Sequence, residues 1–140
     1  MTIIEKYIEH NNYGKVLGMH FTIIETGLVH YHLTITKEHL ATPKAVHGGV
    51  IAAFMDSILG VAALSCSQQN NNVVSTIEFK INYLAPALLG DELLGIGKVE
   101  QLGNRIIISS GDVFCTNRGN KLIAKALGTF NAYPLEKAAL

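Results

Sequence analysis

The sequence predicts an α+β fold in which a curved, largely antiparallel sheet wraps around one long central helix. Three observations predict it. Residues 50–66 form one long apolar run, several other segments alternate between apolar and polar residues, and short turn sequences separate the later segments. Because short turns can join only antiparallel strands, the alternating segments are expected to form an antiparallel sheet.

The N-terminal residues, 1 to about 10, have the spacing of an amphipathic helix, with Ile3, Ile4, Tyr7 and Ile8 on one side. The sequence NNYG at 11–14 is expected to end this helix. Residues 18 to about 26 look extended, and a turn is expected at 25–27.

Residues 29–36 alternate as a half-buried strand does, with Val29, Tyr31, Leu33 and Ile35 on one face and His30, His32, Thr34 and Thr36 on the other. His30 and His32 share the polar face and could in principle bind a metal. No third ligand lies near them in the sequence, so we expect surface histidines and no metal site.

The apolar run VIAAFMDSILGVAALSC at 50–66 is predicted to be the central helix. It is slightly short for a membrane span and carries Asp56 near its middle, so a buried helix of a soluble protein explains it better. A helix that is apolar nearly all round needs cover on more than one side. The sheet would cover part of it, and a partner subunit could cover the rest.

A second clear alternation follows a polar turn at 68–72, with Ile77, Phe79, Ile81 and Tyr83 against polar neighbours, and Pro86 ends this strand. Three further strands are expected at about 92–101, 105–116 and 121–131. The sequences GN at 103–104 and NRGN at 117–120 are typical of hairpin turns. We find no repeat or linker and expect residues 1–140 to form one domain.

The composition is apolar and electrically neutral. Hydrophobic residues make up 49% of the 140 residues and charged ones only 16%, which favours a homo-oligomer with a buried subunit interface. The net charge is zero and there is no basic run, so we expect neither a nucleic-acid nor a membrane partner. Cys66 and Cys115 lie in apolar stretches, which favours reduced thiols. The N-terminal residues do not resemble a secretory signal, so we expect a cytoplasmic protein.

Asp56 is the most informative single residue. It is the only side chain between Val50 and Cys66 expected to be ionised, and a carboxylate in such surroundings is costly unless it is hydrogen-bonded, solvated or functional. A structural Asp satisfied by the backbone or by a hydroxyl group such as that of Ser57 is the alternative explanation, and burial alone does not separate the two.

Gly48 and Gly49 precede the apolar run and are expected at its N-terminus. Free N–H groups there, with the helix dipole, could hold the developing oxyanion of a carbonyl substrate, although two glycines could equally form only a tight turn. Gly48 and Asp56 are eight residues apart, about 12 Å along one helix. One chain therefore cannot aim both at the same carbonyl, whereas two helices related by a two-fold axis could.

His47-Gly48-Gly49, then Asp56 after six residues, then the strand TIEFKINYLAPA together resemble the hotdog-fold thioesterases. The phenylacetate-degradation type of acyl-CoA thioesterase is the best match, with the pattern T/S-x-E/D-x-x-I-x-Y/F-x-x-P-A. The later residues fit as well: Gly90-Asp91, Gly103, Gly119 and the final GTF. The resemblance extends over residues 15–131 and implies a hotdog fold, acyl-CoA as substrate without any other cofactor, and a dimer or a tetramer of two dimers.

The resemblance also implies roles for five residues. The Gly48 amide would hold the thioester oxygen, and Asp56 of the neighbouring subunit would act as general base or nucleophile. His47, Gly49 and Thr76 would bind the substrate, with Thr76 helping to place the water. Many relatives carry Asn or Gln shortly before HGG, whereas residues 40–46 here read LATPKAV, and only the hydroxyl of Thr42 could substitute.

Two other functions fit the same residues. A non-catalytic acyl-CoA-binding module would use the same pocket without turnover. A dehydratase acting on 3-hydroxyacyl thioesters would pair His47 with an acidic residue. Lys80, Arg105, Arg118 and Lys121 are the candidates for binding the phosphates of coenzyme A.

Overall fold

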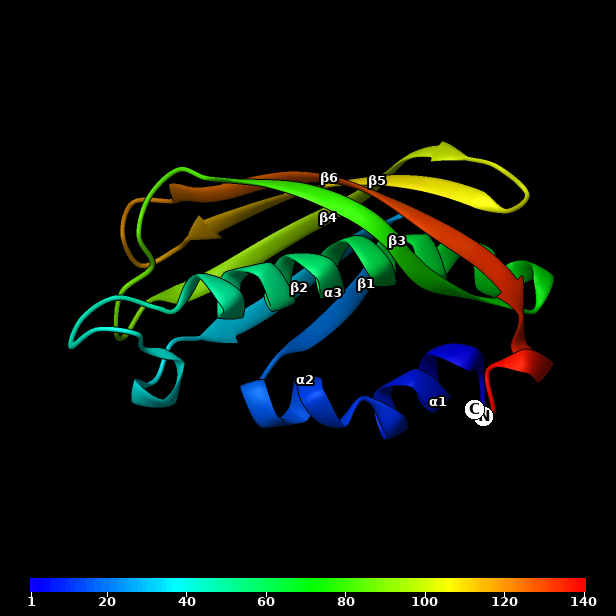
Figure 1. Ribbon diagram of the computed structural model, residues 1–140, viewed down its shortest axis with the longest axis horizontal. Helices are drawn as coiled ribbons and strands as arrows, with labels where there is room; N and C mark the ends of the chain where they lie inside the picture. The colour runs from blue at the N-terminus through cyan, green and yellow to red at the C-terminus, as the bar shows by residue number, and fades with distance from the viewer.

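One antiparallel sheet curves around the long helix α3 in the computed structural model, which describes residues 1–140 (Figure 1). The elements in chain order are α1 (Ile3–His10), α2 (Asn12–Leu17), β1 (His20–Glu25), β2 (Leu28–Thr34), η1 (Lys37–His39), α3 (Gly48–Ser67), η2 (Gln68–Asn70), β3 (Asn72–Tyr83), β4 (Glu92–Leu102), β5 (Ile106–Cys115), β6 (Lys121–Pro134) and η3 (Leu135–Lys137). The predicted α+β hotdog architecture is therefore confirmed.

The strand order is β1-β2-β4-β5-β6-β3, and every neighbouring pair is antiparallel. The turns expected between β4 and β5 and between β5 and β6 do form hairpins. Residues 84–91 form no hairpin: they carry the chain from β3 to β4, which lies in the interior of the sheet. β3 is consequently an edge strand that pairs only with β6, and its other side is open.

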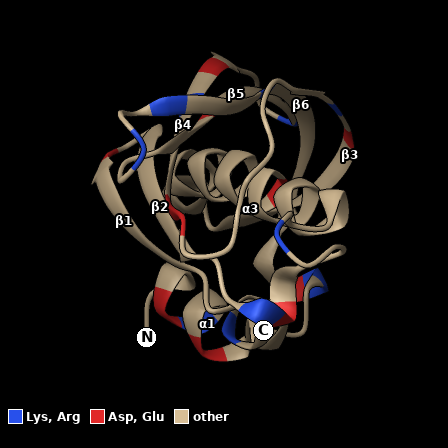
Figure 2. Cartoon of the chain, turned by 90° about the vertical axis from the view of Figure 1, so that its left-hand side faces the viewer, with Lys and Arg blue, Asp and Glu red and all other residues tan.

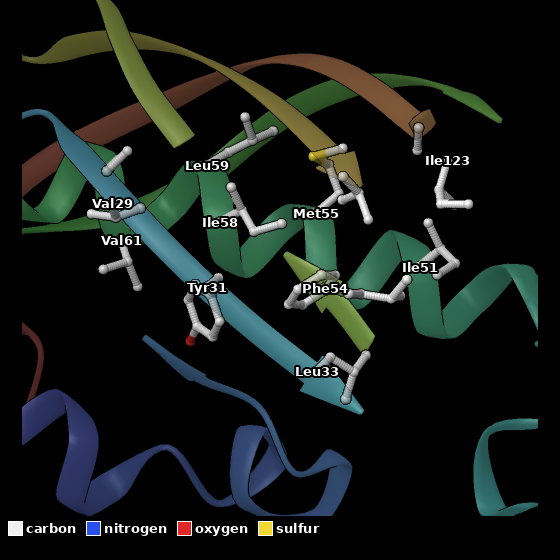
Figure 3. Close-up of a cluster of buried hydrophobic side chains, with 14 of the residues drawn as sticks. Val29, Tyr31, Leu33, Ile51, Phe54, Met55, Ile58, Leu59, Val61 and Ile123 are labelled. Carbon is white, nitrogen blue, oxygen red and sulfur yellow. The ribbon is translucent and has the colours of Figure 1, made fainter. Parts of the chain in front are cut away.

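The core forms between α3 and the concave face of the sheet, where Phe54, Ile58, Leu59 and other side chains of α3 are fully buried (Figure 3). Helix and sheet approach closely because glycines face α3. At Gly97 of β4, an added Cβ would lie 2.6 Å from the carbonyl oxygen of Ile58, a distance that no side chain allows. By length and composition, α3 with η2 could cross a membrane, but most of this segment is buried under its own sheet, as the sequence predicted.

The N-terminal helices lie on the side of α3 away from the middle of the sheet, and α1 lies close to the last residues of the chain (Figure 1). α1 begins at a capping box formed by Thr2 and Glu5. The sequence did not predict α2. The side chain of Asn11 caps its start and Gly18 ends it with a positive φ, so residues 11–14 begin a second short helix after α1 ends.

Charged residues are distributed along the strands and the terminal segments, and neither sign gathers in one place (Figure 2). This distribution agrees with the zero net charge of the chain. Cys66 and Cys115 are both buried and unpaired, as predicted.

Candidate active site

Asp56 lies in the middle of α3, on a side of the helix that the sheet does not fully cover, and is half-buried. Its Oδ1 accepts a hydrogen bond of 2.8 Å from the hydroxyl group of Thr76 in the edge strand β3. The neighbouring Ser57 does not satisfy it, because the Ser57 hydroxyl donates to the carbonyl oxygen of Ala53 at 2.9 Å. The structure thus brings together Asp56 and Thr76, two residues assigned to the site by resemblance.

A cavity of about 360 Å³ opens beside this pair, between α3 and β3. Nine of the fourteen lining residues are hydrophobic, and the polar side chains among the rest are those of Asp56, Ser57, Ser75 and Thr76. The lining residues are Tyr7, Asp56, Ser57, Gly60, Val61, Leu64, Val73, Val74, Ser75, Thr76, Phe130, Tyr133, Ala138 and Leu140. A carboxylate that borders a largely apolar cavity is typical of a ligand site.

Tyr7 is a member of this lining that sequence reasoning did not assign to the site. Its hydroxyl accepts a hydrogen bond of 3.1 Å from the side-chain amide of Asn11. Burial, together with the negative charge of Asp56, raises the pKa of Tyr7, which therefore stays neutral. No local signal could have revealed this role, because Tyr7 follows the apolar periodicity of α1.

The other predicted residues lie together at the N-terminus of α3. His47 is the N-cap, and its Nδ1 accepts a hydrogen bond of 2.7 Å from the Gly49 amide. The Gly48 amide has no hydrogen-bond partner in the chain and points out of the first turn. The hydroxyl of Tyr83, at the end of β3, donates to the Gly48 carbonyl oxygen at 2.8 Å and holds this turn against the edge strand.

One chain keeps these two groups apart. Gly48 and Asp56 both belong to α3, so about 12 Å of helix separates them, as the sequence predicted. β3 carries Thr76 beside Asp56 and Tyr83 beside Gly48, and its outer edge is unpaired. An unpaired strand edge offers free backbone donors and acceptors to another chain.

Arg118, a candidate for binding phosphate, is engaged elsewhere. Its guanidinium donates to both carboxylate oxygens of Asp91, at 2.9 and 2.7 Å, and to the carbonyl oxygen of Pro86 at 3.0 Å. Burial opposes ionisation of Asp91, but the bonds from Arg118 and the Leu88 amide outweigh it and lower the pKa of Asp91. Arg118 therefore links its own turn to the segment that contains Pro86 and Asp91. Its guanidinium is not free to bind a phosphate.

Thr42 lies in the loop that precedes α3. Its hydroxyl oxygen accepts a hydrogen bond of 2.9 Å from the Ala45 amide in the same loop.

The histidines of the first two strands lie beside one another. The ring of His32 stacks on the ring of His20 of β1, with the centroids 5.2 Å apart. No group of three or more His, Cys, Asp or Glu side chains is placed to hold a metal ion.

A family model described as the thioesterase superfamily matches residues 44–121, which include α3, both candidate groups and strands β3 to β5. The chain belongs to the thioesterase superfamily. The predicted family and the predicted enzyme class, a thioester hydrolase, are thereby confirmed.

Relatives of this superfamily member match most of its length. Human acyl-coenzyme A thioesterase 13 is 29% identical over 130 residues, which cover 91% of this chain and 89% of the human protein. A proposed esterase of Archaeoglobus fulgidus is 31% identical over 115 residues, covering 82% of this chain and 71% of that protein.

Solved structures show the same fold. The Escherichia coli PaaI protein of the phenylacetic acid degradation operon superposes with a TM-score of 0.84 at 19% identity, covering 93% of this chain and 90% of PaaI. A thioesterase protein of Streptococcus pneumoniae, solved with coenzyme A, superposes with a TM-score of 0.74 at 21% identity, covering 83% and 86% of the two chains.

Proposed function

We propose that this protein hydrolyses the thioester bond of acyl-CoA, with Asp56 as the general base or nucleophile. The observation that carries the proposal is the carboxylate of Asp56, which accepts a hydrogen bond from Thr76 and lines a cavity whose lining residues are mostly hydrophobic. The names of the relatives support acyl-CoA as the substrate, as do the neighbours solved with coenzyme A or acetyl CoA.

The reaction needs a nucleophile and a donor for the carbonyl oxygen. In the first route, Asp56 takes a proton from water, the hydroxide attacks the thioester carbon, and coenzyme A leaves as the thiol after protonation. In the second route, the Asp56 carboxylate attacks the thioester carbon, the C–S bond breaks, and coenzyme A leaves as the thiol after protonation. Water then hydrolyses the mixed anhydride, which releases the carboxylic acid and regenerates Asp56. In both routes the developing oxyanion needs a free N–H group.

The Gly48 amide is the donor best suited to that oxygen, because it is unpaired at the positive end of a long helix. Gly49 and His47 support it by shaping the turn. The Gly49 amide is already donated to His47, and a Cβ at residue 49 would lie 2.8 Å from the His47 Nδ1. Because the Nδ1 of His47 caps its own helix, a dehydratase in which His47 acts with an acidic residue is the weaker candidate.

We infer that two chains are needed for one site. Asp56 of one subunit would face Gly48 of the other across a two-fold axis beside β3, because a single α3 separates them by about 12 Å. Exposed apolar side chains on and just after β3 support this interface: Ile77 is 53% exposed, Tyr83 52% and Leu84 53%. A dimer, or a tetramer built from two such dimers, in the cytoplasm is the proposed working form.

The test is a hydrolysis screen with short, medium, aryl and long acyl-CoAs, in which thiol release is measured. We expect Asp56→Ala and Asp56→Asn to lower kcat/KM at least a hundredfold. Glu25→Gln, an exposed carboxylate on β1, is the control and should behave as wild type. An Asp56→Ala variant as active as wild type would overturn the mechanism.

The same samples separate the alternative functions. Tight acyl-CoA binding in a calorimeter without release of thiol would indicate a binding module. Hydration of an enoyl-CoA would indicate a dehydratase. Sedimentation of wild type as a monomer at assay concentration would contradict the shared site.

A further inference from the structure

We propose that His39 is a positioning residue for the reaction, because it ties the end of α2 to the turn that presents the Gly48 amide. The inference rests on the proposed function and gives a role to a residue and a helix that the site does not otherwise use. It follows from the hydrogen bonds of His39, whose ring and backbone carbonyl bind different parts of the chain.

His39 is the last residue of η1 and the only one of the six histidines that is buried, with 5% of its surface exposed. A buried polar ring is costly unless both nitrogens are hydrogen-bonded. Nδ1 accepts a hydrogen bond of 3.0 Å from the Thr36 amide, and Nε2 lies 2.8 Å from the Leu17 carbonyl oxygen. Because an amide only donates and a carbonyl only accepts, the ring carries its proton on Nε2. Two backbone groups therefore fix both the position and the tautomer of the ring.

The ring docks the end of α2. Leu17 is the last residue of that helix, and the last carbonyl groups of a helix have no partner within it. The amide of the C-cap Gly18 donates to carbonyl groups of the preceding turn and leaves that of Leu17. His39, twenty-two residues later, donates to the Leu17 carbonyl oxygen. The N-terminal helices are thus held against η1 through one side chain.

The backbone of His39 reaches the turn at the start of α3. Its carbonyl oxygen accepts a hydrogen bond of 2.9 Å from the His47 amide. The loop between these two residues leaves at Leu40 and returns at Val46, which form an antiparallel bridge. His39 and His47 are therefore the base of a small hairpin. Because Gly48 directly follows His47, a displacement of this base also displaces the Gly48 amide.

The direction of that amide matters more in the transition state than in the ground state. Loss of one oxyanion donor lowers kcat about a hundredfold or more. A misplacement of about 1 Å can cost about a hundredfold. A residue that aims the donor therefore affects kcat more than KM. A residue that only stabilises the fold lowers the Tm and leaves the kcat of the folded protein unchanged.

The test measures kcat and KM for acyl-CoA in His39→Gln, His39→Asn and His39→Leu. The side-chain amide of Gln can donate to the Leu17 carbonyl, whereas Asn can accept only from the Thr36 amide and Leu can do neither. We expect His39→Gln to keep about a third of kcat or more, His39→Asn to lose about tenfold and His39→Leu about thirtyfold, with KM within about twofold of wild type. Loss through KM alone, or a His39→Gln variant no better than His39→Leu, would overturn the role.

Ser65→Ala is the matched control. Ser65 is also buried, and its hydroxyl joins a turn to α3: it accepts the Gly27 amide at 2.8 Å and donates to the Ala62 carbonyl oxygen at 2.7 Å. It lies toward the end of α3 opposite Gly48. We expect Ser65→Ala to lower the Tm and to retain the kcat of wild type. An equal loss of kcat in Ser65→Ala and His39→Leu would mean that lost stability alone explains both.

Hydrogen exchange distinguishes failure of this role from failure of the proposed function. The exchange rate of the His47 amide, measured by NMR, reports the bond to the His39 carbonyl without any substrate. It should rise about tenfold or more in His39→Leu and stay near the wild-type value in His39→Gln and Ser65→Ala. An unchanged rate in His39→Leu would overturn the link between His39 and the turn. Faster exchange in His39→Leu, with no hydrolysis of acyl-CoA by any sample including wild type, would retain that link and reject the proposed enzyme.

Discussion

Thr76 and Asp56, twenty residues apart, are joined by a hydrogen bond of 2.8 Å that links the edge strand to the central helix. The donor is the Thr76 hydroxyl and the acceptor is the carboxylate. The bond therefore restricts the direction in which the second carboxylate oxygen of Asp56 points.

The first prediction concerns this bond. Thr76→Val keeps the shape of the side chain but removes the donor. A hydrogen bond to a charged group contributes about 1.5 kcal/mol or more, so kcat for acyl-CoA should fall about tenfold or more with little change in KM. Thr76→Ser should retain most of the activity. Equal activity of Thr76→Val and wild type would show that the bond does not orient Asp56 in the reaction.

The turn that presents Gly48 is the subject of the second prediction. In Gly49→Ala, the new Cβ would approach the His47 Nδ1 to 2.8 Å and break the cap on the Gly49 amide. We expect kcat/KM to fall at least tenfold, because the Gly48 amide is no longer held in the orientation in which it donates to the oxyanion. Helix content by circular dichroism should be unchanged. Wild-type kinetics in this variant would show that the hydrogen bond between His47 and the Gly49 amide does not contribute to catalysis.

The ion pair between Arg118 and Asp91 gives a prediction about stability and pH. The carboxylate of Asp91 is 5% exposed, so Arg118→Ala would leave a buried charge without its partner and lower the free energy of unfolding by about 3 kcal/mol at pH 7.

The sign with pH follows from the direction of the shift. Folding lowers the pKa of Asp91, so the stabilisation is complete above the unfolded-state pKa and is lost as the pH falls through the lower folded-state value. Urea unfolding at pH 7 and pH 3 should therefore show a difference between wild type and Arg118→Ala that shrinks at pH 3. A difference independent of pH would mean that Arg118 stabilises the fold only by packing.

Ser109 supplies the fourth prediction. Its hydroxyl is fully buried in β5 between Val99 and Gly128 and is the one buried side-chain polar atom without a hydrogen-bond partner. Ser109→Ala removes this unsatisfied group and should raise the free energy of unfolding by about 1 kcal/mol, or the Tm by about 3 °C. A clear loss of stability would indicate that a buried water satisfies the hydroxyl.

Much of the fold was predictable because its signals are local. The apolar run at 50–66 falls within α3, Gly48–Ser67, and the alternation at 77–83 falls within β3. Both periodicities follow from how a helix or strand presents side chains to one core. The same apolar run also predicted that Asp56 lies in the middle of α3 and that Gly48 lies in its first turn.

Other features depended on residues far apart in the chain. Sequence spacing predicted hairpins but not that β3 would lie at the edge beside β6, because strand order is set by how the whole sheet closes around α3. Ser57 was the local candidate to satisfy Asp56, and Thr76 does so. The sequence did not predict that Arg118 binds Asp91, which lies twenty-seven residues earlier in the chain.

The sequence by itself therefore determined the central helix and most of the strands, the carboxylate in that helix and the glycines at its start, because each is encoded by residues close to one another in the chain. Only the tertiary structure decided which groups meet: Thr76 with Asp56, Tyr83 with Gly48, and Leu140 with Leu64 and Val73. These contacts form when the sheet wraps the helix, and no local pattern specifies the register at which it does so.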